Sequence, residues 1–260
     1  MKKIKNRFFE VYIALALLFL YAPILVLMVF SFNDSKNMGK WSGFTLRWYK
    51  ELFMDETILT ALFNTLTVAI IASVVATIIG TVAAIYIHNM KSKKGKSFIL
   101  NLNYLPVVNP DIVTGISLML LFTALGITRG YFTMVLAHIT FNIPYVVLSI
   151  LPKLKQMPAN LYEAAIDLGA TPLYATWKVV IPQIMPGIIT GFLFAFTLSL
   201  DDFVITFFTT QGTSNLSLLV YSMAKRGISP EINALSTIMF VVVMVVLIAI
   251  NLRKPKKERV

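Results

Sequence analysis

The sequence predicts an all-α polytopic membrane protein, and three observations support this fold class. Of the 260 residues, 57% are hydrophobic and only 13% are charged, whereas charged residues make up about 25% of a typical soluble domain. The mean hydropathy is +0.78, and the apolar residues gather in runs that reach the ~20 residues needed to cross ~30 Å of hydrocarbon. Most basic residues stand in short segments beside these runs, so membrane topology explains the net charge of +11, and we expect no nucleic-acid partner.

The first apolar run, residues 11–30, follows a basic start and predicts an uncleaved transmembrane helix. A secretory signal peptide is the alternative reading of such a start. Its apolar core would span about 7–15 residues and end at a small-residue cleavage site. This run is longer and leads into SFNDSKNMGKW, which has no A-x-A pattern.

Five further apolar runs complete a prediction of six transmembrane helices within one integral membrane domain, residues 1–260. They cover residues 61–87, 98–125, 131–151, 186–209 and 233–252. The run at 98–125 carries a polar interruption, NPD, and its Pro106 and Pro110 are expected to break the helix and let polar groups line a pathway. An even number of spans places both termini on one side of the membrane.

The distribution of basic residues predicts which side that is. Lys and Arg gather at the N-terminus, at 91–96, at 153–178 and at 253–259. The positive-inside rule makes these segments cytoplasmic, so both termini are expected in the cytoplasm. The opposite loop at 31–60 holds Trp41, Trp48 and Tyr49, which fit an aromatic belt at the membrane interface.

The longest cytoplasmic connection, residues 152–185, is predicted to be ordered. A short helix is expected from about Ala159 to Leu168, with an apolar face at i, i+3, i+4 and i+7, and Gly169 is placed to end it. A second helix is expected to start with Thr171 as its cap, and Pro182 is expected to limit its length.

This connection carries a motif that resembles one of a known family. EAA at 163–165, glycine at 169 and VVIP at 179–182 are similar to E-A-A-x3-G-x9-I-x-L-P, the EAA motif of bacterial ABC importer permeases. The resemblance implies the MetI-like fold of type I importer permeases. It also implies that 152–185 is a coupling loop docking on a separate ATPase subunit, with the contact made by Glu163, Ala164, Ala165 and Gly169. The alternative for such an amphipathic helix is a position on the membrane surface.

The chain itself is predicted to have no catalytic, metal or cofactor site. KSKKGKSF ends like a phosphate-binding loop, but Met90 stands where the first glycine is required. The chain has no Cys, and its histidines, His88 and His138, show no metal-binding spacing and are expected to mark a helix end and a packed polar site. ATP and Mg²⁺ are therefore expected on the partner ATPase.

Two adjacent acids in an apolar run, Asp201 and Asp202, are the main candidates for cargo binding. Insertion of Asp at the centre of a transmembrane helix costs about 2.5–3.5 kcal/mol, so such groups are expected to face protein or a water-filled cavity. Helical spacing puts Ser199, Asp202 and Thr206 on one polar stripe, with Thr197 and Asp201 on its neighbour.

A third acid, Asp111, follows the interruption in the third run, and these stretches hold no Lys or Arg. An acidic cluster without countercharge attracts cations and works against anionic cargo. Polyamines fit, because methylene stems separate several ammonium groups, and aromatic side chains such as Phe203 add cation–π contacts.

SLDDF and NPDIVTGISL, together with the EAA motif, resemble spermidine/putrescine permease subunits of the PotC type over essentially the whole chain. The resemblance implies a bacterial cell-membrane complex with a homologous second permease, two ABC ATPase subunits and an extracellular polyamine-binding protein. It implies cargo binding by Asp111, Ser199, Asp201 and Asp202. Trp48 is added only as an aromatic residue of the first outer loop.

Other readings remain open from the residues. The cargo of an ABC permease with these acids is alternatively another organic cation, such as a thiamine-like compound. In a cation-coupled secondary transporter, Asp201 and Asp202 would bind protons or sodium, and inverted repeats would be expected. The chain is alternatively an assembly subunit without a conduction path, or the aspartates bond to the partner permease.

Overall fold

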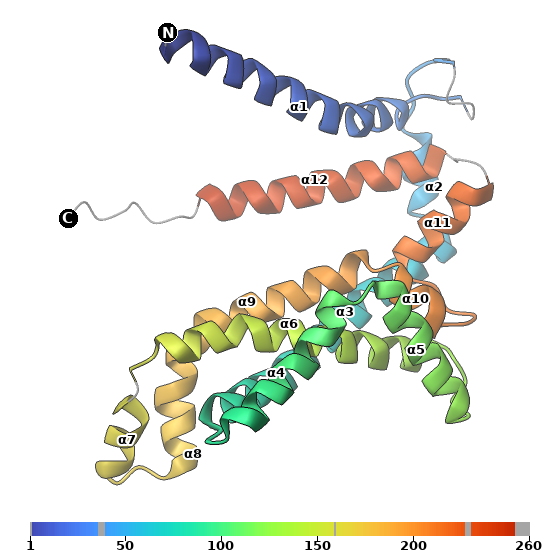
Figure 1. The fold of residues 1–260 in the computed structure, drawn as a ribbon. Coiled ribbons are helices and arrows are strands. Elements are labelled where there is room, and N and C mark those ends of the chain that lie inside the picture. The colour runs from blue at the N-terminus through green and yellow to red at the C-terminus, as the bar shows by residue number, and fades with distance from the viewer. Residues whose placement is uncertain (1, 36–39, 159, 227–229, 253–260) are drawn as a thin grey trace. The chain divides into compact units, whose positions relative to one another are not determined.

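The computed structural model describes residues 2–35, 40–158, 160–226 and 230–252. The described residues form helices, and their only bridge between extended segments joins Asn33 to Phe44. They divide into two compact units (Figure 1). Unit 1 comprises Met1–Leu59 and Val220–Val260, and unit 2 comprises Thr60–Leu219. The all-α prediction is confirmed.

Unit 1 is organised around the two terminal helices. Helix α1 (Lys2–Phe30) packs against α12 (Pro230–Leu252), and α12 also contacts the short α2 (Arg47–Leu52). The loop before α2 is held by Trp48, whose indole Nε1 donates a hydrogen bond to the main-chain oxygen of Asn33 at 2.7 Å. Trp48 is only 1% exposed, so its ring is part of the packing of this loop.

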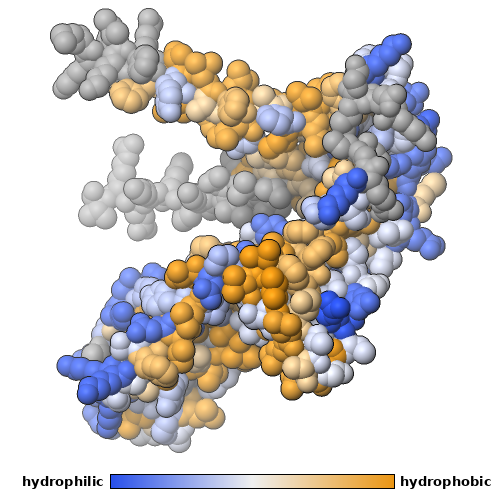
Figure 2. Space-filling view, turned by 45° about the vertical axis from the view of Figure 1, so that its right-hand side comes forward, coloured by the Kyte–Doolittle hydropathy of each residue, from blue (hydrophilic) through white to orange (hydrophobic). Residues whose placement is uncertain are grey.

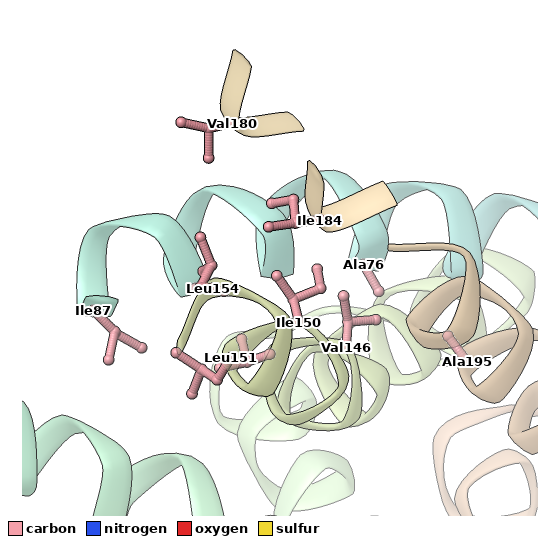
Figure 3. Packing of buried hydrophobic residues seen from close by; sticks show 11 residues of the cluster. Ala76, Ile87, Val146, Ile150, Leu151, Leu154, Val180, Ile184 and Ala195 are labelled. Atoms are coloured by element: carbon pink, nitrogen blue, oxygen red, sulfur yellow. The ribbon is translucent and has the colours of Figure 1, made fainter. Parts of the chain in front are cut away.

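The longer helices described in unit 2 number five, and the first begins just before the boundary of the unit at Thr60. These are α3 (Glu56–Asn89), α4 (Lys93–Val108), α5 (Asp111–Ala124), α6 (Tyr131–Gln156) and α9 (Ile181–Asp201). Helices α6 and α9 lie side by side and make the most extensive contact between any two of the described helices (Figure 1). Figure 3 shows Val146, Ile150 and Leu154 of α6 beside Ile184 of α9 and Ala76 of α3, all members of one apolar cluster.

Two glycines let α9 approach α6 closely. A Cβ atom on Gly187 would lie 2.9 Å from Cγ of Lys153, and one on Gly191 would lie 3.2 Å from Cα of Val146. Larger residues at either position would therefore push the helices apart. The close approach holds α9 against α6, and this helix pair supports the segments at both ends of α9.

The lengths of the helices agree with a chain that crosses the membrane several times. Phe9–Phe30, Glu56–Asn89, Tyr131–Gln156 and Pro172–Asp201 are each long and apolar enough to span it, and α4 with α5 adds a fifth, bent candidate. Helix α12 has 23 residues, so the described helices are consistent with the six predicted spans. Figure 2 shows a broad band of hydrophobic side chains on the exposed surface of unit 2.

The third predicted span is broken at Pro110 as expected, but not at Pro106, which lies inside α4, and the fifth predicted span differs from expectation. The run at 98–125 consists of two helices that meet at 105°, because Asn109 is extended before Pro110. The fifth span was expected at 186–209, but helix runs from Pro172 to Asp201 and then stops where Asp202 turns extended, with φ −62° and ψ 126°. A separate helix, α10 (Val204–Thr209), follows.

The expectation that Pro182 ends the second loop helix is wrong. After α8 (Pro172–Ala175), a π-helical turn, η1 (Thr176–Val180), leads directly into α9. Across this turn the Ile181 N–H donates to the main-chain oxygen of Thr176. Pro182 then lies in the first turn of α9, where its missing N–H and fixed φ are tolerated.

Candidate functional site

The breaks in the third and fifth spans lie together in unit 2. Helix α5, which begins at Asp111, packs along α10, and a Cβ on Gly115 would lie 3.4 Å from the main-chain oxygen of Val204. Beyond the other end of α5, the Arg129 side chain reaches the main-chain oxygen of Phe208 at 3.5 Å. Asp111 begins α5, Asp202 immediately precedes α10, and the two carboxylates lie close enough for their charges to interact. Acids at the N-terminal ends of both helices are therefore brought near each other.

Three carboxylates gather near these N-terminal ends. Those of Asp111, Asp201 and Asp202 lie close enough for their charges to interact. Asp111 and Asp201 are exposed, whereas the side chain of Asp202 is only 8% exposed. Within the described ranges, no Lys or Arg lies within salt-bridge distance of the three. The surface of this site is therefore acidic and without a countercharge.

Asp202 uses its carboxylate to cap α10. Its Oδ1 accepts a hydrogen bond from the Ile205 N–H at 3.0 Å, and its Oδ2 accepts one from the Thr206 N–H at 2.8 Å and one from the Thr206 hydroxyl at 2.9 Å. These bonds satisfy two N–H groups that a helix start otherwise leaves without partners. The aspartate thereby stabilises the break between α9 and α10.

A buried polar cluster extends from this cap, and we call it the break cluster: Asp202, Thr206, His138 and Asn215. Nε2 of His138 lies 3.3 Å from Oδ2 of Asp202 and 3.0 Å from Oγ1 of Thr206. The Asn215 side chain donates to the main-chain oxygen of Asp202 at 2.7 Å and to Oγ1 of Thr206 at 3.1 Å. The break is thus bonded both to the middle of α6 and to the segment that starts α11 (Leu216–Arg226).

Ser199 and Trp48 are placed differently from the exposed acids. Ser199 lies on α9 before the break, is 2% exposed, and its hydroxyl accepts a hydrogen bond from Asn142 at 2.7 Å. Trp48 belongs to unit 1, where its ring is buried. The structure therefore brings Asp111, Asp201 and Asp202 together, and cargo contact by Ser199 or Trp48 stays a prediction.

The coupling-loop prediction agrees with the structure as far as its helices go. Helix α7 (Asn160–Asp167) is followed by Gly169 with φ +86°, a conformation that glycine adopts without strain. Thr171 accepts a hydrogen bond from the Tyr174 N–H and caps α8. Glu163 and Ala164 are exposed, and Leu168 is 89% exposed. Ala159 lies outside the described residues.

Sequence reasoning identified His138 as a packed polar site, which is confirmed, but did not connect it with Asp202. It also missed Asn142 and Asn215. One signal was available: His138 and Asn142 are spaced i, i+4 in an otherwise apolar helix, so they share a face. Local sequence indicates only the cap of α11, in which Oδ1 of Asn215 accepts a hydrogen bond from the Leu218 N–H at 2.9 Å. It does not indicate the bonds of Asn215 to Asp202 and Thr206, which belong to the break and to α10.

Comparison with known proteins gives consistent results. Residues 76–252 match the family described as "Binding-protein-dependent transport system inner membrane component". The putrescine transport system permease protein PotI of Escherichia coli K12 is 43% identical over 235 residues, which cover 88% of this chain and 84% of PotI. The spermidine/putrescine transport system permease protein PotC of the same strain is 40% identical over 235 residues, covering 90% and 89%.

A solved structure shares the fold. It is a chain of a bacterial ABC transporter involved in the import of the acidic polysaccharide alginate, with a TM-score of 0.76 and 15% identity, and the match covers 97% of both chains. At this identity the likeness concerns the fold alone. The cargo of that transporter is acidic, whereas the carboxylates of the present site favour a cation. The cargo therefore has to be inferred from the site and not from the fold.

Proposed function

The chain belongs to the family of binding-protein-dependent transport system inner membrane components and is a permease subunit of an ABC importer; from this premise we propose that its cargo is a polyamine such as spermidine or putrescine. The family decides against the cation-coupled secondary transporter. ATP hydrolysis belongs to a separate chain of such importers, so the permease contributes the path and not the chemistry.

One observation carries the polyamine proposal: Asp111 and Asp201 are exposed beside each other's charge without a neutralising Lys or Arg among the described residues. Two carboxylates in that arrangement repel each other and attract a cation with more than one positive centre. A polyamine places ammonium groups on a flexible apolar stem, so that one molecule neutralises both acids. The names of the two Escherichia coli relatives support the same cargo class.

We assign the proposed cargo residues different tasks. Asp111 and Asp201 meet the ammonium groups directly, because both are exposed. Asp202 and Ser199 lie behind these two acids as buried side chains of the same path, and their hydrogen bonds hold the shape of the break. Trp48 contributes an aromatic face from the first outer loop at a different stage of transport, since its ring is buried here.

The proposed complex contains a homologous second permease, two ABC ATPase subunits that bind ATP and Mg²⁺, and an extracellular polyamine-binding protein. The exposed face of α7, with Glu163 and Ala164, docks in a groove of the ATPase, and Ala165 and Gly169 shape that contact. Residues 1–260 act as one permease domain of the bacterial cell membrane with both termini in the cytoplasm. Closure of the ATPases moves the coupling loops and turns the path outward.

The cargo is tested by uptake of radiolabelled spermidine into cells whose only copy of this subunit is the wild-type chain. Unlabelled putrescine is expected to compete, whereas thiamine and sulfate are not. If thiamine alone inhibited spermidine uptake, the proposed cargo would have to be another organic cation and not a polyamine. Competition by sulfate alone would contradict a cationic path altogether.

A further inference from the structure

We propose that His138 is a positioning residue for cargo transport: by holding Asp202 in the break between α9 and α10, it fixes the direction in which Asp201 faces. The inference rests on the proposed function, because it concerns the same site. His138 is only 1% exposed, so it acts through Asp202 and not by touching cargo.

The break itself decides which of the two adjacent acids is exposed. In a continuous helix, neighbouring side chains diverge by ~100°, and their directions follow from the helix alone. Here α9 ends at Asp201, and Asp202 is extended with ψ 126°. The direction of the Asp201 side chain therefore depends on how the next residue is anchored.

The hydrogen-bond directions show how His138 provides that anchor. The single hydroxyl hydrogen of Thr206 is donated to Oδ2 of Asp202, so Oγ1 of Thr206 is an acceptor for its other partners. Nε2 of His138 lies 3.0 Å from that oxygen, and the tautomer with its hydrogen on Nε2 is the one that pairs with it. The same N–H also faces Oδ2 of Asp202, which lies 3.3 Å from Nε2. It therefore attaches both the Thr206 hydroxyl and the Asp202 carboxylate to α6.

The imidazole is well placed to act as a fixed point. Its neighbours Ala137 and Phe141 belong to a buried apolar cluster that also contains Ile205 of α10 and Leu118 of α5. Helix α6 thus packs against both helices whose N-terminal ends carry the acids. Because the imidazole is fixed in α6, its hydrogen bonds fix the position of the break relative to this apolar cluster. The hydrogen bonds of Asn215 hold the break from the other side.

The test compares two substitutions that keep the volume of the side chain. His138→Gln retains an amide N–H that can reach Asp202, whereas His138→Met fills similar space without a donor. Thr140→Ala is the matched control, because the Thr140 hydroxyl bonds only to the main chain of its own helix, at Leu136. Each is assembled with the second permease, the ATPases and the binding protein in proteoliposomes, and spermidine uptake and ATP hydrolysis are measured together.

We expect His138→Met to lower the spermidine transported per ATP hydrolysed by roughly tenfold, as the loss of a hydrogen bond to a charged group implies. The rate of hydrolysis should stay within about twofold of wild type, since α7 is untouched. His138→Gln should recover most of the ratio, and Thr140→Ala should not change it. Thr206→Val, which removes the hydroxyl between the imidazole and the carboxylate, should lower the ratio as His138→Met does.

Four results would overturn the inference. An unchanged ratio in assembled His138→Met would show that the imidazole does not position the acids. Parallel loss of uptake and hydrolysis, or failure of all three cluster variants to assemble, would mark the cluster as a folding requirement only. A wild-type complex that carries no spermidine would instead contradict the proposed cargo, and the role of His138 in its transport with it.

Discussion

Oδ2 of Asp202 lies 3.3 Å from Nε2 of His138, so the break in the fifth span is bonded to the middle of α6. This contact separates two acids that are adjacent in sequence. Asp202 turns inward and caps α10, whereas Asp201 stays exposed beside Asp111. Stability and cargo binding should therefore respond differently to substitution of the two aspartates, and the following predictions start from that difference.

Asp202→Ala should destabilise the permease, and Asp201→Ala should not. Removing Asp202 leaves the N–H groups of Ile205 and Thr206 without their acceptor, and the loss of such a cap costs about 1–2 kcal/mol. The thermal unfolding midpoint of the purified complex in detergent measures the effect. A larger decrease for Asp201→Ala than for Asp202→Ala would contradict the assignment of the cap.

Gly115→Leu should separate α5 from α10 and lower stability. A Cβ at this position would lie 3.0 Å from Cδ2 of Phe208 and 3.4 Å from the Val204 oxygen, and overpacking of this kind costs about 1–3 kcal/mol. Because the same contact brings Asp111 to Asp201, spermidine uptake per assembled complex should decrease as well. Gly130→Ala is the control, since a Cβ there meets nothing within 4 Å. Equal stability of Gly115→Leu and wild type would show that this contact does not hold the site.

Gly169→Ala should weaken the attachment of the ATPase. Gly169 has φ +86°, and a left-handed conformation costs an ordinary L-residue roughly 1–2 kcal/mol. The end of α7, with Ala165 accepting a hydrogen bond from the Ala170 N–H at 3.0 Å, would shift to relieve that strain. Co-purification of the ATPase with the permease measures the result.

The matched variant for this position is Gly169→Asn, because asparagine tolerates the left-handed region better than alanine. It should retain more of the ATPase than Gly169→Ala does. The reverse order would show that side-chain size at position 169, and not backbone conformation, controls docking.

Much of this architecture was predictable because it depends on local patterns. Apolar runs predicted most of the spans, and Gly169 and Thr171 correctly marked the end of α7 and the start of α8. The helical spacing correctly grouped Asp202 with Ser199 and Thr206, and Asp201 with Thr197, but it did not indicate that the first group is the buried one. These signals work because capping and helical period involve residues only a few positions apart.

The break and its bonds were not predictable in the same way. The apolar run at 186–209 continues through the break, and this led to a fifth span predicted across it. The i, i+3, i+7 spacing of Ser199, Asp202 and Thr206 fits an unbroken helix equally well. His138 and Asn215 stabilise the other arrangement from distant segments. The passage of helix through Pro182 likewise depends on a π turn, which proline spacing alone does not reveal.

The most direct test of a cationic path bordered by Asp201 is spermidine uptake by Asp201→Asn in complexes shown to assemble at wild-type levels. Glu10→Gln is the control, as it also removes one exposed carboxylate but lies outside the site. We expect Asp201→Asn to reduce uptake by roughly tenfold or more, because one of the two acids that neutralise the cargo is lost, and Glu10→Gln to leave it unchanged. Wild-type uptake by an assembled Asp201→Asn complex would contradict the assignment of this acid to the cargo path.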